Sequence, residues 1–137
     1  MPDEETSATR RDAAAVVSRE LVSLHKQFYG KGPVRAKTYL VNDTVLCVLE
    51  GGFTVVERTL IEVGRAPAVH DIRTSFQAAM REQFTKVVET ALGRSVRAYL
   101  SQVHTDPDIA VELFLLEPAG TDADDEFTFE LEDPGAA

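Results

Sequence analysis

The glycines and prolines of this 137-residue chain fall between stretches of regularly spaced apolar residues, and none of them interrupts such a stretch. Because glycine and proline break helices and strands, their positions divide the chain into segments whose periodicity can be interpreted one at a time. Agreement between breakers and periodicity is typical of a sequence that specifies one compact fold. The length fits a single domain.

Three of these segments have the spacing of helices. A first helix is expected from about Arg10 to Tyr29, because its large apolar residues recur on one side. Thr54 and Glu57 have the spacing of a capping box, in which each side chain bonds to the backbone amide of the other residue. A short helix should follow and end at Gly64. A long helix is expected from Pro67 to about Leu92, with its apolar residues on one face.

Four further segments are expected to be strands. Ala36–Val41 and Thr44–Glu50 flank an Asn-Asp turn, and Val96–His104 and Ile109–Glu117 flank a Thr-Asp-Pro-Asp turn, so each pair predicts a hairpin. The element order αββ-α-αββ predicts an α+β fold, in which a four-stranded, mostly antiparallel sheet packs with one N-terminal, one short and one long helix. Each half repeats a glycine, a basic residue and Val-Arg-Ala where a helix leads into a strand, which is either an internal repeat or a coincidence.

Two of the expected strands are apolar on both sides. Val45–Leu49 is apolar at every position, and Leu113–Leu116 continues this pattern in the last strand. A strand with one face in water should alternate apolar and polar residues, so both faces of this sheet should be covered. One layer of helices covers only one face. We therefore predict a homodimer whose apolar interface, built on the sheet or on the long helix, covers the other face.

Charge is distributed unevenly along the chain. Lys and Arg number 14 against 23 Asp and Glu, and the net charge of -9 argues against nucleic acid or an anionic membrane surface as the main partner. Seven of the acids and none of the bases lie in residues 119–137. We therefore expect residues 1–9 to be a disordered N-terminus, residues 10–118 to form the domain, and residues 119–137 to be an acidic flexible tail. Phe127, Phe129 and Leu131 alternate within this tail, so a second interpretation is an added edge strand or a segment that docks on a partner.

Several classes of protein are not expected. No apolar run approaches the length of a membrane-spanning helix, and the acidic N-terminus is unlike a signal peptide, so we expect a soluble cytoplasmic protein without direct membrane insertion. Cys47 is the only cysteine and lies in an apolar strand, where an inert buried thiol is expected. His25, His70 and His104 are scattered, without a metal-binding or catalytic motif around them. We expect no catalytic residue, no metal and no cofactor.

Basic residues gather near the two corners where a helix leads into a strand. The Gly-Lys-Gly-Pro segment offers free backbone amides and an ammonium group, which suit a small anion or a carboxylate. The alternative is that these cations only favour the C-terminal end of a helix. An anion-binding site here would use Gly30, Lys31, Gly32, Arg35, Arg73 and Arg94. Such a site would indicate a small-anion-binding sensor or an uncharted enzyme rather than an interaction subunit.

The order of these features resembles the MpsC family, a component of the sodium-translocating membrane-potential-generating system. The resemblance rests on Gly30-Lys-Gly-Pro33, Thr54-Val-Val-Glu57 with Leu60, Arg73 with Phe76, and Gly93-Arg94 with Val96. It covers about residues 10–117, and Phe53 stands where many members have a leucine before the threonine. The resemblance implies a non-catalytic accessory or regulatory subunit in the cytoplasm, associated with ion or bicarbonate uptake through an integral membrane partner.

Overall fold

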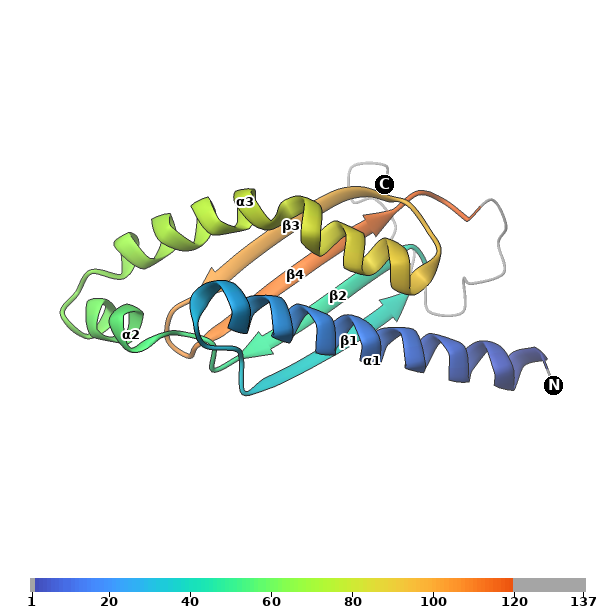
Figure 1. The fold of residues 1–137 in the computed structure, drawn as a ribbon, viewed down its shortest axis with the longest axis horizontal. Helices are drawn as coiled ribbons and strands as arrows, with labels where there is room; N and C mark the ends of the chain where they lie inside the picture. The colour runs from blue at the N-terminus through green and yellow to red at the C-terminus, as the bar shows by residue number, and fades with distance from the viewer. Residues whose placement is uncertain (1, 120–137) are drawn as a thin grey trace, which may run out of the picture.

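The computed structural model describes the backbone of residues 2–119 and the side chains of residues 9–119. Within these residues, three helices and four strands follow one another in the expected order (Figure 1). The elements are α1 (Pro2–Tyr29), β1 (Arg35–Val41), β2 (Thr44–Glu50), α2 (Val55–Glu62), α3 (Ala66–Leu92), β3 (Val96–His104) and β4 (Ile109–Leu116). The strands form one antiparallel sheet in the order β1-β2-β4-β3, so the predicted α+β fold is confirmed.

α1 is longer than its sequence pattern predicts. It begins at Pro2, whereas the apolar stripe indicates a start near Arg10 and a disordered segment before it. Proline is favoured in the first turn of a helix, where its missing N–H costs no hydrogen bond. The stripe marks only the part of the helix that packs on the sheet, so it does not locate the helix start. Residues 120–137, which hold nearly all of the expected acidic tail, lie outside the described residues.

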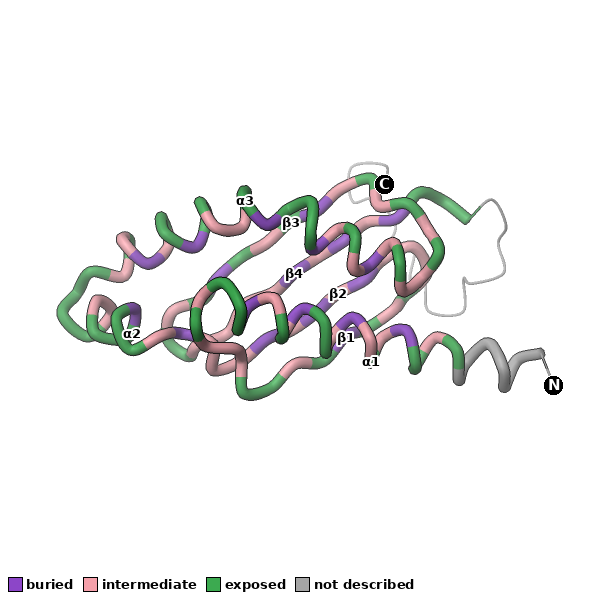
Figure 2. The backbone as a smooth tube through the Cα atoms, in the orientation of Figure 1, coloured by how far each residue is buried: buried purple, intermediate pink, exposed green. Residues whose placement is uncertain are grey.

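Both long helices lie on the same face of the sheet. α1 packs against β1, α3 packs against β3, and the two helices contact each other (Figure 1). Figure 2 shows the buried residues concentrated where these helices lie over the strands. α2 lies at the end of the sheet and packs against α3. The helices therefore cover only one face of the sheet, as expected for a single layer of helices.

The core lies between this helical layer and the sheet. Its fully buried side chains come from both long helices and from the two central strands: Val17, Leu21, Phe84, Val88, Val45, Cys47 and Phe114. Buried and half-buried residues alternate along β2, so this chain buries the apolar run of β2 on one face only. Burial raises the pKa of the Cys47 thiol to about 11. Such a thiol is protonated at neutral pH and a poor nucleophile, in agreement with the expected inert cysteine.

Local signals in the sequence correspond to turns and caps in the structure. Asn42 has a positive φ of 52° in the two-residue turn between β1 and β2, a conformation that asparagine tolerates better than most residues. The Thr54 N–H donates to Glu57 Oε1 at 2.9 Å, and the Glu57 N–H donates to Thr54 Oγ1 at 3.2 Å. This reciprocal pair at the start of α2 confirms the predicted capping box.

We expect Thr54→Ala to lower the free energy of unfolding by about 0.5–2 kcal/mol, because the Glu57 amide loses its side-chain acceptor. Chemical denaturation followed by circular dichroism measures the change. Thr59→Ala is the matched control, since Thr59 is exposed and its hydroxyl donates to the Val55 carbonyl of the same helix. A loss in Thr54→Ala no larger than the loss in the control would contradict a stabilising role for the cap.

Candidate functional site

The Gly-Lys-Gly-Pro corner connects α1 to β1 and is closely packed. Gly30 adopts a positive φ of 81°, and its N–H closes the last turn of α1. Gly32 lies against the same helix, since a Cβ at this position would come within 3.2 Å of the Val22 carbonyl oxygen. The Lys31 ammonium group donates to the Phe53 carbonyl at 3.1 Å. The corner therefore ties the end of α1 to the loop that precedes α2.

Arg73, in α3, is buried and binds Glu57. Its Nε and Nη2 atoms donate to the two carboxylate oxygens, each at 2.6 Å, and Nη2 also donates to the Gly52 carbonyl at 3.0 Å. The guanidinium carbon lies 3.8 Å from the centre of the Tyr29 ring, which is a cation–π contact. The Arg73–Glu57 pair therefore links all three helices and the loop after β2 at one point.

Opposing effects determine the charge state of this pair. Burial by itself would raise the pKa of the Glu57 carboxyl, but hydrogen bonds from Arg73 and Thr54 hold that pKa below its ordinary value. Burial also opposes the charge on Arg73, yet its bonds to the Glu57 carboxylate raise the pKa of the guanidinium. Both groups therefore remain charged at neutral pH, and the hydrogen bonds of Arg73 are made within the chain.

Arg94 and Arg35 lie apart from Arg73. Arg94 Nη2 donates to Asp43, in the β1–β2 turn, and to a main-chain carbonyl just after β4. From Arg73 to its end at Leu92, α3 extends about 28 Å at 1.5 Å per residue, and Arg94 lies beyond that end. Arg35 is in β1, with a side chain that is 76% exposed and 3.6 Å from a Glu50 oxygen. The structure does not bring the six predicted residues into one cluster, and an anion site at the corner itself stays a prediction.

The sequence patterns do not indicate a second buried polar cluster. It is formed by Glu112, Tyr99 and His25. The Tyr99 hydroxyl donates to one Glu112 oxygen at 2.5 Å, and His25 Nε2 lies 3.7 Å from the other. Burial, and next the charge of Glu112, raise the pKa of the Tyr99 hydroxyl, so it stays protonated. The one feature of the sequence that could have indicated this cluster is the single glutamate within the apolar β4 strand. All three side chains are nearly closed off from solvent, so the cluster lies within the core.

The face of the sheet that points away from the helices is apolar, and no described residue covers it. The strand registers align Tyr39, Leu46, Leu113 and Leu100 as one row across all four strands. The neighbouring rows add Val41, Leu115, Ala98, Val48 and Val111. We call this surface the open face. At its two edges Tyr39 is 43% and Leu100 is 53% exposed. Contiguous exposed apolar surface is typical of sites where proteins bind one another.

Within residues 9–119, no group of three or more His, Cys, Asp or Glu side chains is placed to hold a metal ion. None of the helices that the structure describes is both long and apolar enough to cross a membrane. The open face is the candidate functional site because its side chains are apolar, and docking is what this chemistry permits.

Arg73→Met should lower the free energy of unfolding by about 3–5 kcal/mol at neutral pH, because it leaves the Glu57 carboxylate buried without its partner. The difference from wild type should shrink as the pH falls below about 4.3, the ordinary glutamate value. The reason is that a lowered pKa stabilises the fold above that value and loses this contribution as the carboxylate is protonated.

Urea denaturation of the two proteins at several pH values measures this difference. Arg35→Met is the matched control, since its pair with Glu50 is exposed and such pairs contribute about 0–1 kcal/mol. Equal losses in the two variants would contradict a special role for the buried pair.

Comparison with known proteins places the chain in a family. No curated protein and no solved structure matches it significantly. Residues 9–118 match the family described as Na+-translocating membrane potential-generating system (MpsC). This range contains all four strands, α2, α3 and most of α1. The chain therefore belongs to the MpsC family.

Proposed function

We propose that this protein is a non-catalytic accessory or regulatory subunit of a membrane ion or bicarbonate uptake system, acting in the cytoplasm through protein contacts. The family match links the chain to a Na+-translocating membrane system. The open face is the observation on which a docking role depends, because it presents apolar side chains from all four strands. The buried ionisable groups support the same view, since Arg73 pairs with Glu57 and Tyr99 with Glu112 inside the core.

A second copy of this chain is the proposed occupant of the open face. With strands about 4.8 Å apart and residues about 3.3 Å apart, four strands of about seven residues present a face of roughly 19 by 23 Å. Two such faces can stack about 10 Å apart as a sandwich, which covers both of them at once. The row containing Leu46 and Leu113 then meets its own copy across a two-fold axis, as a closed homodimer requires. Arg35, Glu50 and His104 lie in the end row, where a polar rim is typical of interfaces.

Leu100→Glu should convert the dimer into a monomer. Leu100 is 53% exposed in the single chain, so the monomer should stay folded, whereas a carboxylate enclosed between two apolar faces would lack a partner. Val56→Glu is the matched control, because Val56 is 68% exposed and lies on α2, away from the open face. Light scattering at micromolar concentration gives the mass. A wild-type mass near the 15.0 kDa of one chain would contradict the homodimer.

The membrane partner is tested by purifying the tagged full-length chain from detergent-solubilised membranes of its own cell. We expect an integral membrane protein to elute with the chain as a complex of fixed stoichiometry, because the family match implies work on a membrane system. Leu100→Glu and Val56→Glu, purified in parallel, show whether the open face contributes to the association. Recovery of the wild-type chain without an integral membrane protein would contradict the accessory role.

A further inference from the structure

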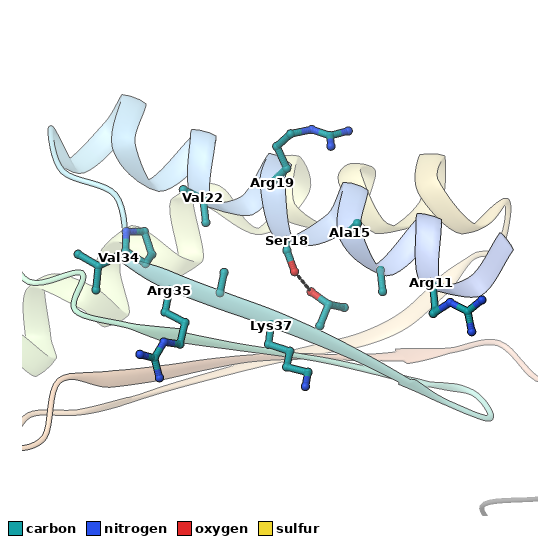
Figure 3. Close-up of a pocket in the computed structure, with 12 residues that line it drawn as sticks. Arg11, Ala15, Ser18, Arg19, Val22, Val34, Arg35 and Lys37 are labelled. Carbon is teal, nitrogen blue, oxygen red and sulfur yellow. Dashed lines mark hydrogen bonds between the residues drawn. The ribbon is translucent and has the colours of Figure 1, made fainter. Parts of the chain in front are cut away.

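A groove of about 610 Å³ runs between α1 and β1 at one edge of the sheet (Figure 3). We call it the edge groove. β1 is the first strand in the sheet order, so its outer backbone edge pairs with no other described strand. Ala14, Ala15 and Ala36 line the groove with small apolar side chains. The Ser18 and Thr38 hydroxyls, 2.7 Å apart, tie α1 to β1 there. The groove thus combines an unpaired strand edge with a helix surface that carries small apolar side chains and the two arginines Arg11 and Arg19.

The two sides of β1 differ in chemistry. Ala36, Thr38 and Leu40 face the helices, opposite the buried residues of β2. Arg35 and Lys37 point the other way, and Figure 3 shows both side chains on the side of β1 opposite α1. Both are exposed, and the contact of Arg35 with a Glu50 oxygen at 3.6 Å is a weak surface pair. A strand added here would fit best with apolar side chains toward α1 and acidic side chains on the other side.

The chain itself contains a segment with this pattern. Residues 127–132 read Phe-Thr-Phe-Glu-Leu-Glu, with apolar residues at alternate positions and two glutamates between and after them. We infer that residues 127–132 add to β1 in the edge groove as a fifth, antiparallel strand of the same chain. Addition of an extended segment to an exposed sheet edge is a common recognition mode, in which backbone hydrogen bonds give affinity and alternate side chains give specificity.

One antiparallel register satisfies both sides of β1. Setting Glu130 opposite Lys37 also sets Glu132 opposite Arg35, so two pairs of opposite charge form across the strands. A shift of one residue would turn every side chain to the other face, which would place the aromatic rings among Arg35 and Lys37 and away from the small apolar side chains of α1. The apolar residues of the segment then lie on the α1 side, with Phe127, Phe129 and Leu131 opposite Leu40, Thr38 and Ala36.

The path of the chain permits this addition. β1 and β4 are both antiparallel to β2, so they run in the same direction. β4 ends beside the β1–β2 turn, where the Leu116 N–H donates to the Asp43 carbonyl at 2.8 Å. From there, the outer side of β1 is three strand spacings away, about 14 Å. The chain between Leu116 and Phe127 can span about 33 Å when extended, which leaves slack for the crossing.

The opposite edge of the sheet fits the segment less well. The open-face side of β3 carries Ala98, Leu100, Gln102 and His104, and the arginines near this edge are Arg97, at the bulge of the strand, and Arg81 of α3. The segment would also have to run parallel to β3, because β3 is antiparallel to β4. The groove beside β3 is smaller, at about 260 Å³. Direction and size therefore favour β1.

Hydrogen–deuterium exchange of the full-length chain tests this inference. Peptides that cover β1 should exchange about tenfold more slowly in the wild type than in Glu130→Lys/Glu132→Lys, because loss of the added strand exposes the edge amides of β1. Arg35→Glu/Lys37→Glu should show the same faster exchange. Combining all four substitutions restores opposite charges across the two strands, so it should restore slow exchange.

Asp122→Lys/Asp124→Lys is the matched control, because it changes the net charge equally but lies outside the proposed strand. It should leave exchange of β1 unchanged, and faster exchange in this control would overturn the inference. The inference would also be overturned if β1 exchanged equally fast in the wild type and in the charge variants, or if it exchanged fast in the variant with all four substitutions. Slow exchange that disappears on dilution would assign the segment to a second copy and overturn the arrangement within one chain. The same charge substitutions are also measured in the Leu100→Glu variant. Because this variant should be a monomer, a change in β1 exchange there does not depend on the homodimer.

Discussion

Both long helices lie over the same face of a four-stranded sheet, and this one-sided cover determines what the rest of the molecule presents. β2 is apolar on both faces, so Val45, Cys47 and Leu49 fill the core while Leu46 and Val48 face away from the helices. Exposed apolar surface costs about 25 cal/mol per Å² in water. A second protein surface over the open face removes that cost. The apolar open face thus follows from where the helices pack, because their own core uses only half of the apolar side chains in the central strands.

A buried ion pair also connects the three helices. Arg73 contacts Glu57 of α2, the Gly52 carbonyl before α2, and the Tyr29 ring at the end of α1. The desolvation cost of burying two charges offsets much of their attraction, so such a pair contributes little net stability compared with apolar residues of the same size. Its contacts instead join the three helices and the loop before α2 at one point.

Local features could be predicted from the sequence because the interactions that make them span few residues. The Thr54–Glu57 capping box and the turn at Asn42 depend on neighbours within three positions. The partner of Arg73 lies 16 residues away, and no periodicity in the sequence connects the two. Charge alone made Arg73 a candidate anion ligand, since a buried, paired arginine and an exposed one look the same in a sequence. The burial of Glu112 is hidden for the same reason, because it depends on β4 lying at the centre of the sheet.

The face and the edge of the sheet also affect each other electrostatically. Arg35 and Lys37 project on the same side of β1 as the open face, so a homodimer formed there brings cations of both copies toward its rim. Like charges near an interface disfavour association unless they are neutralised. A strand that sets Glu132 and Glu130 beside these cations lowers that repulsion and leaves the apolar row from Tyr39 to Leu100 unchanged. Occupation of the edge groove would therefore favour closure of the open face, which gives the acidic segment a way to influence assembly without entering the interface.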